Sequence, residues 1–274
     1  MSDTRQISVS EARSVLDSTR IGERTLLDVR QDYEYAAGHL PGATHIPLPE
    51  LAERAGELDA NLPTLVYCRS GVRSLAGANL LSGLGFREAR SIQGGITAWD
   101  GAQATGPRDL GLGALLSART PQEALERAWG MELALEQYYT ALADRAGDAG
   151  LAALFTRLAG FEERHRRTLM EIWRRLGPGD ESAFAERAAK AVAPGTLEGG
   201  INSAEYLGQL GDPASTAEAL ELAMAVEAQA MDLYLRRAAG EPDADLRATF
   251  LQLAEAEKAH LKVLGTFVDD RKGF

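Results

Sequence analysis

Cys68 is the one cysteine in this 274-residue chain, and the segment that follows it, CRSGVRS, carries two arginines, Arg69 and Arg73. The thiolate is the nucleophilic form of cysteine, and nearby cations or a helix N-terminus stabilise it. The pattern therefore predicts a reactive sulfur at Cys68. A single cysteine forms no internal disulfide, which is typical of a reducing compartment.

The spacing after Cys68 separates sulfur chemistry from phosphate chemistry. A cysteine phosphatase loop places arginine at the sixth position after the cysteine, whereas Ser74 stands there and Arg73 comes one place early. This shorter loop favours a sulfur substrate, and Gly71 allows it to curl tightly. Two other interpretations stay open, a buried structural cysteine and a fold that only docks a partner.

A second set of residues recurs at an offset of 95 positions. Each copy has a Glu-x-x-His pair, whose spacing places both side chains on one face of a helix, and an earlier glutamate. Four glutamates and two histidines form the ligand set of ferritin-like dimetal bundles. The six predicted ligands are Glu132, Glu162, His165, Glu227, Glu257 and His260.

Buried carboxylates are costly unless cations neutralise them, and oxygen and imidazole ligands suit iron or manganese. We therefore predict two iron ions, with manganese or a mixed pair as alternatives. One Glu-x-x-His pair alone is common on a solvated face, but its repetition in apolar surroundings favours metal binding. Glu163 has no repeat partner and is assigned to the solvated face. Tyr139 and Tyr234 are either hydrogen-bond donors to the glutamates or core residues.

The elements that position Cys68 alternate between strands and helices. The segments RTLLDVR, ATHIPL, TLVYC and ARSIQ are typical of strands, and SVSEARSVLD and SLAGANLLSGL of helices. This order predicts an α/β domain over residues 1–105, with a mostly parallel sheet and flanking helices. Cys68 ends a strand and a helix begins near Ser74, so the loop lies at the carboxyl edge where such sheets place their sites.

Residues 106–119 form the predicted linker, within a stretch of glycine, proline and polar residues that begins at Asp100. The remainder, 120–274, is predicted to be an all-α, ferritin-like four-helix bundle made of one helical hairpin and its copy. Its long helices are expected near 121–146, 148–176, 216–239 and 243–268.

Two features of this second half fix how the hairpins begin and connect. TPQE at Thr120 and STAE at Ser215 match a capping box. The connection over 177–214 contains DESAFAERAAKAV, which predicts a short extra helix across one end. One long crossover between two hairpins is the connection of ferritin-like bundles.

Composition limits the classes of partner. The net charge of −11 and pI near 5.0 argue against nucleic acid or an anionic membrane as the partner. The sequence has no window typical of a membrane span and no apolar core of a signal peptide near its start, so we expect a cytoplasmic protein. His39, His45 and Trp99 are interpreted as structural residues.

Over about residues 5–100 the chain resembles the rhodanese family of sulfurtransferases. The motifs LLDVRQDYEYAAGHLPGATHIPL, CRSGVRS and IQGGITAW occur in the family's order. The resemblance implies that Cys68 takes sulfane sulfur from a small donor as a persulfide and passes it to a thiol or protein acceptor. It implies supporting catalytic roles for Asp28 and Arg30. It also implies a substrate-binding loop, in which the two arginines assist catalysis, of Arg69, Ser70, Gly71, Val72 and Arg73.

Residues 120–270 resemble the rubrerythrin branch of the ferritin-like superfamily, through the two Glu-x-x-His motifs and the segments MELALEQYY and AVEAQAMDLY. The resemblance implies a di-iron site bridged by Glu162 and Glu257. It assigns to one iron Glu132, Glu162 and His165, and to the other Glu227, Glu257 and His260.

Two departures from rubrerythrins affect the expected function. The chain lacks the four cysteines of their rubredoxin-like centre, so an external electron donor is implied. Met224 stands where those proteins tend to have a further ligand glutamate, which favours an oxidase or iron-handling role over a peroxidase.

The sequence thus predicts a sulfurtransferase fused to a di-iron bundle that reacts with oxygen or peroxide. The alternative is an iron-storage or oxidant-sensing protein with a non-catalytic docking module. A homodimer is the expected oligomer, because ferritin-like bundles often pair through exposed helix faces.

Overall fold

The computed structural model describes residues 5–107, 115, 118, 120–176, 179–197, 202–208 and 216–271. The chain divides into two compact units, Met1–Arg108 and Asp109–Phe274. Most of the predicted linker and the predicted cap at Ser215 lie outside the described residues.

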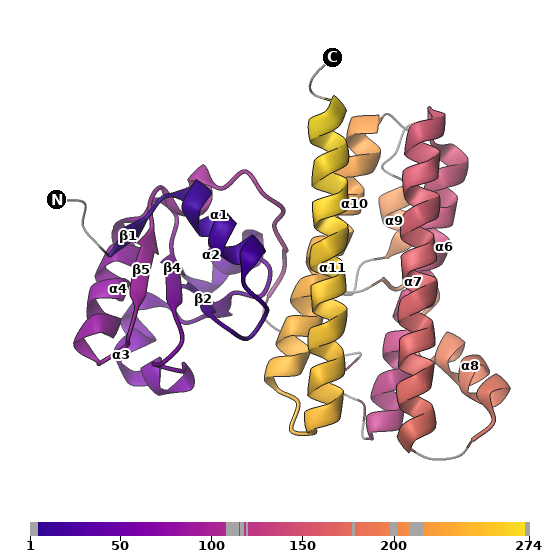
Figure 1. Ribbon diagram of the computed structural model, residues 1–274, viewed down its shortest axis with the longest axis horizontal. Helices are drawn as coiled ribbons and strands as arrows, with labels where there is room; N and C mark the ends of the chain where they lie inside the picture. Colours follow the sequence, from indigo (N-terminus) through magenta and orange to yellow (C-terminus); the bar gives the residue numbers. More distant parts are fainter. Residues whose placement is uncertain are drawn as a thin grey trace. The chain divides into compact units, whose positions relative to one another are not determined.

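The first unit alternates short strands and helices around one sheet (Figure 1). Its elements are β1 Gln6–Ile7, α1 Val9–Ser18, β2 Thr25–Asp28, α2 Asp32–Ala37, β3 Thr44–His45, α3 Leu51–Arg54, β4 Thr64–Tyr67, α4 Val72–Gly83 and β5 Ala89–Ile92. Three short 3-10 helices accompany them, η1 Leu48–Glu50, η2 Ala55–Glu57 and η3 Gly95–Ala98.

The strand order is β1-β5-β4-β2-β3, and every strand pair is parallel. Asp28 pairs with Tyr67 on one side and with His45 on the other, so β2, β3 and β4 end in line. Because parallel strands finish at the same edge, the residues that follow them gather there. Cys68 and Arg30 are brought to this edge in this way.

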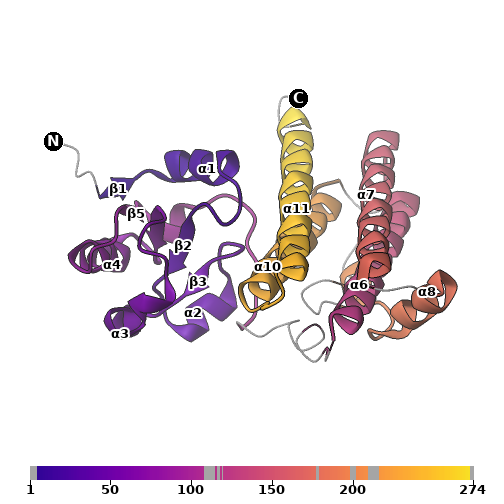
Figure 2. The ribbon, with the colours of Figure 1, turned by 60° about the horizontal axis from the view of Figure 1, so that its bottom comes forward.

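The two faces of the sheet carry separate apolar clusters. Leu27, Val66 and Cys68 pack with residues of α3 and α4, whereas Leu26 and Tyr67 pack with residues of α1 and α2. Successive strand side chains point to opposite faces, which explains this alternation. Figure 2 shows α1 and α3 on opposite sides of the sheet.

The structure differs from the sequence prediction at several short elements. The strand β1 and the helices α2 and α3 were not predicted, since segments of two to six residues carry little periodicity. The helix α4 begins at Val72 and not near Ser74, so Arg73 lies in its first turn. It ends at Gly83, within the predicted helical segment SLAGANLLSGL.

The second unit contains four long helices, which Figure 1 shows running alongside one another. They are α6 Pro121–Arg145, α7 Ala149–Leu176, α10 Thr216–Ala239 and α11 Ala244–Arg271. Two shorter helices, α8 Glu181–Lys190 and α9 Ser203–Gly208, lie in the connection between the hairpins. The structure confirms the predicted fold class, a parallel α/β domain followed by a ferritin-like bundle.

Polar side chains cap three of the long helices of the bundle at their N-termini. Thr120 caps α6 by accepting a hydrogen bond from the Glu123 N–H. Asp148 accepts one from the Leu151 N–H at 2.9 Å, and its repeat partner Asp243 does the same for Leu246 at 2.9 Å. Such caps satisfy N–H groups that have no partner within the helix. The second helix of each hairpin therefore begins one residue later than predicted.

The connecting helix α8 packs beside α6 near one end of the bundle (Figure 1). Phe184 of α8 lies between Trp129 and Trp173, with ring centroids 6.1 Å and 4.7 Å away. Gly130 permits this approach, because a Cβ there would lie 2.4 Å from the Ala188 carbonyl oxygen.

Candidate functional site

Cys68 follows directly on β4, and α4 begins four residues later, so a short loop joins the sulfur to a helix N-terminus. Gly71 takes a left-handed backbone conformation with φ of +99°, which a side chain would strain. Its N–H donates a hydrogen bond to the Cys68 Sγ at 3.2 Å. Cys68 as a whole is 1% exposed. The loop thus curls back over the sulfur and points backbone donors at it.

These donors control the protonation of the thiol. Burial acts to raise the pKa of Cys68, but the Ser74 hydroxyl and the backbone N–H groups of Ser74, Gly71 and Ser70 outweigh it, so the pKa is lowered. Hydrogen bonds to a charged form favour that form. The loop therefore favours the thiolate.

The segment after β5 holds the loop from outside. The Ile96 and Thr97 N–H groups donate to the carbonyls of Cys68 and Arg69 at 2.9 and 3.1 Å. Gly95 lies so close that a Cβ there would be 2.2 Å from the Cys68 carbonyl oxygen. The IQGGITAW motif thus contributes a backbone strap, Gly94–Ala98, against the cysteine loop.

The two arginines of the loop lie in different environments. The Arg73 guanidinium makes two hydrogen bonds to the Glu34 carboxylate, at 2.6 and 2.7 Å. Hydrogen bonding from Arg73 lowers the pKa of Glu34 to about 2. Arg69 is exposed and makes no ion pair with any residue that the structure describes. Arg69 is therefore the loop arginine whose charge no described carboxylate offsets.

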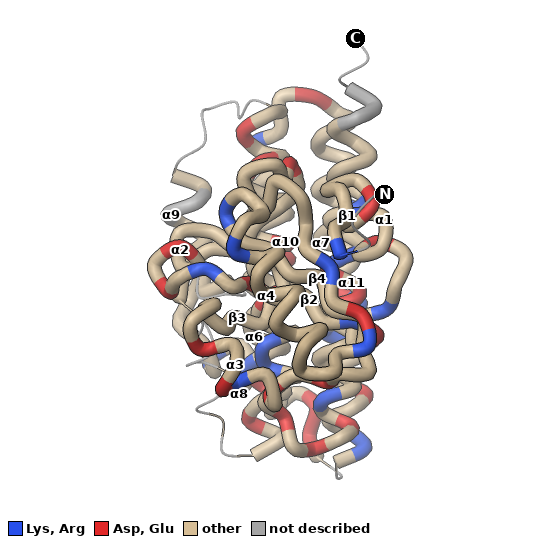
Figure 3. The backbone as a smooth tube through the Cα atoms, turned by 90° about the vertical axis from the view of Figure 1, so that its left-hand side faces the viewer, with Lys and Arg blue, Asp and Glu red and all other residues tan. Residues whose placement is uncertain are grey.

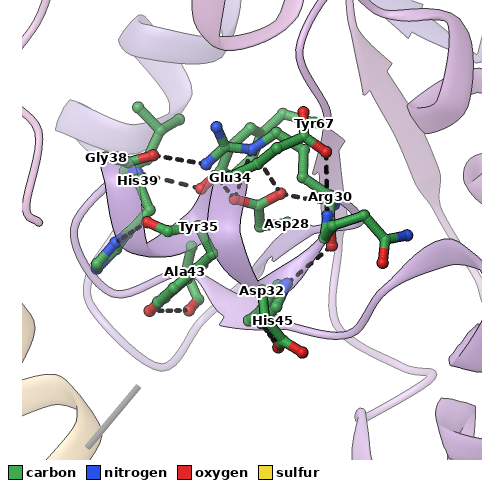
Figure 4. Close-up of polar contacts among 12 residues, drawn as sticks. Asp28, Arg30, Asp32, Glu34, Tyr35, Gly38, His39, Ala43, His45 and Tyr67 are labelled. Atoms are coloured by element: carbon green, nitrogen blue, oxygen red, sulfur yellow. Dashed lines mark hydrogen bonds and ion pairs between the residues drawn. The ribbon is translucent and has the colours of Figure 1, made fainter. Parts of the chain in front are cut away.

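Asp28 and Arg30 form a buried pair at the end of β2 (Figure 4). The Arg30 Nη2 donates to the Asp28 carboxylate and to the Gly38 carbonyl, both at 2.6 Å. Its guanidinium lies over the Tyr67 ring, 5.5 Å from the centroid. The charges of Cys68 and Asp28 both act on Arg73, which places the pair in the electrostatic surroundings of the loop.

His39 and His45 stack on the Tyr35 ring, with centroids 3.7 and 4.5 Å away. The His45 Nε2 lies 2.8 Å from the Arg30 carbonyl oxygen (Figure 4). Both histidines are buried, and their contacts support the edge where Arg30 lies. This agrees with the structural role expected from the sequence.

The six predicted metal ligands come from four helices and meet inside the bundle. Glu132 comes from α6 and Glu227 from α10, while α7 and α11 each supply a Glu-x-x-His pair. All four glutamates are fully buried, and the histidines are 8% and 4% exposed. The structure therefore brings all six side chains to one centre.

Their ligand atoms fall into two overlapping groups, within each of which they lie no more than 4.8 Å apart. A first-row cation lies about 2.1 Å from its ligands, so ligand atoms on one ion are separated by roughly 4 Å or less. The first group is Glu132, Glu162, His165 and Glu257. The second is Glu162, Glu227, Glu257 and His260. Glu162 and Glu257 belong to both groups, as bridging carboxylates must.

Each histidine lies close to three of the four glutamates. The His165 Nδ1 lies 3.0 Å from Glu132, 3.0 Å from Glu162 and 3.3 Å from Glu257. The His260 Nδ1 makes the corresponding approaches to Glu227, Glu257 and Glu162 at 3.1, 2.9 and 3.5 Å. The repeat in the sequence thus becomes a repeat in the geometry.

The two tyrosines cross between the hairpins. The Tyr234 hydroxyl of α10 donates to Glu132 of α6 at 2.6 Å, and the Tyr139 hydroxyl of α6 donates to Glu227 of α10. Burial raises the pKa of Tyr139 well above its usual value, so the phenol stays protonated and can donate. The structure therefore favours hydrogen-bond donors over simple core residues at both positions.

The donor set fits a pair of cations. Both carboxylate oxygens of Glu162 and of Glu257 are buried, and no described donor meets them in hydrogen-bond geometry, although the Nδ1 atoms of His165 and His260 lie 3.0 and 2.9 Å away. Burial raises the pKa of these two carboxyls well above the usual range. Burial alone would lower the pKa of His165, but the charges of Glu132 and Glu257 raise it. Protons thus compensate a centre with too much negative charge, which two divalent ions would neutralise.

Two neighbouring positions lie outside the ligand set. Glu163 is exposed and lies 3.7 Å from Arg167, on the solvated face as expected. Met224 is half-buried and packs against the apolar core.

Sequence reasoning did not identify three residues that build the cysteine site. Glu34 holds Arg73, Tyr67 lies beneath Arg30, and the Ser91 hydroxyl lies 2.7 Å from that of Ser74. Glu34 lies within the motif LLDVRQDYEYAAGHLPGATHIPL, and Ser91 directly precedes the motif IQGGITAW. Their position in or beside these motifs was the one available signal in the sequence.

Basic and acidic residues are interspersed along the described chain (Figure 3). None of its described helices combines the length and the apolar character that a membrane crossing requires.

Comparison with known proteins finds two families along the chain. The model of the rhodanese-like domain matches residues 8–102, and the rubrerythrin model matches residues 123–268. These matches confirm both resemblances predicted from the sequence.

The first unit is similar to several individual proteins. Thiosulfate sulfurtransferase GlpE of Pseudomonas entomophila (strain L48) is 36% identical over 99 residues, which are 36% of this chain and 87% of GlpE. YrkF of Bacillus subtilis (strain 168) is 35% identical over 96 residues, 35% of this chain and 51% of YrkF, so the chain spans about half of that relative. The human single-domain sulfurtransferase TSTD1 matches with 31% identity and a TM-score of 0.31, over 35% of this chain and 94% of TSTD1.

Proposed function

Because the chain belongs to the rhodanese-like family over residues 8–102 and to the rubrerythrin family over residues 123–268, we propose that it joins two activities. Cys68 carries sulfane sulfur from a donor to an acceptor, and the bundle reacts with oxygen or peroxide at two iron ions. The family membership supports a sulfurtransferase in general terms. The persulfide at Cys68 and the oxidant at the bundle are the specific parts of the proposal.

The proposed sulfur transfer takes place in two displacements at sulfur. The Cys68 thiolate attacks the outer sulfur of the donor, so an S–S bond to Cys68 forms and the S–S bond of the donor breaks. The donor leaves as sulfite or as a thiolate. An acceptor thiolate then attacks the outer sulfur of the Cys68 persulfide, takes that sulfur and releases the Cys68 thiolate. No external oxidant or reductant is consumed.

The loop residues support this sequence by their donors and charge. The N–H groups of Ser70, Gly71 and Ser74 lower the pKa of Cys68, which favours the attacking thiolate in the first step and the leaving thiolate in the second. In this proposal the exposed Arg69 attracts the anionic end of the donor. The observation that supports the proposal most directly is the hydrogen bond from the Gly71 N–H to the sulfur.

Sulfur transfer from thiosulfate to cyanide tests this half of the proposal. We expect thiocyanate formation by the intact chain and none above background for Cys68→Ala. Ser82→Ala is the matched control, because Ser82 lies near the far end of α4 and bonds to the Ala78 carbonyl. Equal activity of Cys68→Ala and the unaltered chain would refute the proposed role of Cys68.

In the bundle, the four glutamates and two histidines would hold the two iron ions, with Glu162 and Glu257 between them. When bound, such ions supply electrons to oxygen or peroxide. The protein residues do three things. Tyr139 and Tyr234 orient the terminal carboxylates, the apolar helix faces exclude water, and the carboxylates balance the charge of the cations.

Metal analysis and the visible spectrum of aerobically purified protein test the bundle. We expect about two irons per chain. Glu162→Gln should lose metal, whereas Glu163→Gln, its neighbour on the solvated face, should keep it. Unchanged metal content in Glu162→Gln would refute the proposed ligand set.

The set of six ligands, with Met224 in place of a further glutamate, favours an oxidase or iron-handling role over a peroxidase. Because the chain has a single cysteine, the electrons come from an external donor. Oxygen and peroxide consumption by the iron-loaded chain separates these roles. Consumption coupled to an added reductant supports an oxidase or a peroxidase, according to the oxidant consumed. Retention of iron without turnover supports storage or sensing.

A further inference from the structure

The two histidines of the metal centre are covered differently on their outer sides. Phe161 of α7 stacks on the His260 ring, with centroids 4.7 Å apart and planes inclined by 12°. His260 in turn stacks on His165, with centroids 5.2 Å apart. The three rings therefore form one stack that has an aromatic cover at the His260 end.

Two arginines hold the Phe161 ring in place. The guanidinium of Arg164 lies 4.3 Å from the ring centroid and that of Arg157 lies 5.4 Å away. Both arginines are exposed, and neither forms an ion pair with a side chain in the described ranges. A cation over an aromatic face is attracted by the ring quadrupole. The His260 side is thus closed by a ring and carries two positive charges.

The repeat puts no aromatic residue at the corresponding position on the His165 side. At the offset that relates His165 to His260, Phe161 corresponds to Ala256, Arg157 to Gln252 and Arg164 to Ala259. A methyl group cannot cover an imidazole ring as a phenyl group does. The side chain of His165 is accordingly 11% exposed and that of His260 5%.

We propose that metal ions and small oxidants reach the two metal positions unequally, because the position at His165 is open on the side of Ala256, while Phe161 closes the position at His260. This inference rests on the proposed di-iron function and assigns to Phe161 and Ala256 the control of access. Repulsion by Arg157 and Arg164 acts in the same direction on an approaching cation. Neither Phe161 nor Ala256 is a ligand, so both can be changed without removing a donor atom.

Cobalt(II) uptake by the metal-free chain tests the inference, because cobalt absorbs visibly when bound and the readout needs no turnover. We expect two kinetic phases of equal amplitude in a stopped-flow experiment. Phe161→Ala should accelerate the slower phase by about tenfold, since loss of the ring removes both its stacking and its cation–π contacts. Ala256→Phe should slow the faster phase and leave the slower one unchanged.

The two variants must act on different phases, and a merely structural change would alter both alike. One uptake rate in the unaltered chain, or one phase affected by both variants, would overturn the inference. Phe161→Leu keeps apolar bulk without an aromatic face and should give the same direction with a smaller change, so it decides the matter if Phe161→Ala fails to fold. Absence of cobalt binding altogether would instead refute the di-iron proposal itself.

Discussion

Glu34 determines how much positive charge the cysteine loop presents. From the sequence alone, Arg69 and Arg73 are equally available to a substrate. In the structure, the carboxylate of Glu34 binds both terminal nitrogens of Arg73. Its charge offsets that of Arg73 and leaves Arg69 as the exposed cation. The pair also fixes the first turn of α4, next to the backbone donors that surround the sulfur.

This pair predicts a dependence of stability on pH. Arg73 lowers the pKa of Glu34 from 4.5 to about 2 in the folded protein. The carboxyl therefore stabilises the fold fully above pH 4.5, and this contribution is lost as the pH falls toward 2. Glu34→Gln should cost about 1–2 kcal/mol near neutral pH, after allowance for solvent screening of the partly exposed pair.

Urea unfolding of both proteins between pH 7 and pH 3 measures this difference, and groups common to both cancel in the comparison. The difference between Glu34→Gln and the unaltered chain should shrink as the pH falls. A difference that stays constant over this range would show that the ion pair is not its source.

At this scale the sequence identifies the reactive residues better than their partners. Cys68 and the six candidate metal ligands could be identified from their side-chain types and their spacing in the sequence. Glu34 lies 39 residues from Arg73, and a carboxylate on a short helix has no local signal for that contact. The sequence offered the glutamates as partners of Tyr139 and Tyr234 but not the crossing between hairpins, because spacing fixes the face of a helix and not the neighbour across it.

The Gly94–Ala98 strap leaves no room for a side chain at Gly95. Gly95 has a φ of +56°, and a Cβ there would lie 2.2 Å from one backbone atom and 2.7 Å from others of the cysteine loop. Backbone atoms cannot move aside as the end of a flexible side chain can. The strap and the loop must therefore shift together if Gly95 is replaced.

Gly95→Ala should destabilise the first unit by roughly 2–4 kcal/mol and abolish sulfur transfer. Gly83→Ala is the matched control, because a Cβ at the end of α4 meets nothing within 4 Å. It should leave stability unchanged or raise it by up to about 1 kcal/mol. Urea unfolding and thiocyanate formation measure both variants, and normal transfer by Gly95→Ala would contradict the close approach.

The long helices and the strands β2, β3, β4 and β5 were predictable, whereas β1, α2 and α3 were not. The four bundle helices follow from apolar periodicity and from the repeat, which supplies each prediction twice. The first strand has two residues and α2 has six, too few for a period to emerge. The start of α4 was placed two residues late, because Val72 and Arg73 have no capping signal and the left-handed Gly71 precedes them.

The whole chain consists of two units, each with its own apolar clusters. We propose residues 1–105 and 120–274 as separate domains on this basis. The sequence indicates the division because segments typical of short strands in the first part are followed by segments typical of long helices. Of the linker between them the structure describes four residues, so its boundaries stay a prediction.

Calorimetry of the full chain checks this division through metal removal. Ligands that bind only the folded state stabilise it, by about 2.7 kcal/mol at a free concentration one hundred times the dissociation constant. Removing iron should therefore lower the unfolding temperature of the bundle and leave the transition of the first domain in place. Cys68→Ala should move neither transition. Equal displacement of both transitions by iron removal would contradict independent domains.

Tyr139 and Tyr234 each donate to the glutamate of the other hairpin, so Glu132 and Glu227 both receive their tyrosine hydrogen bond from the opposite hairpin. Two identical hairpins related by a twofold axis would make the same crossed bonds. A single hairpin, half the length of the bundle, would thus assemble the complete centre by self-association. Joining two copies in one polypeptide lets corresponding positions differ, as Phe161 and Ala256 do.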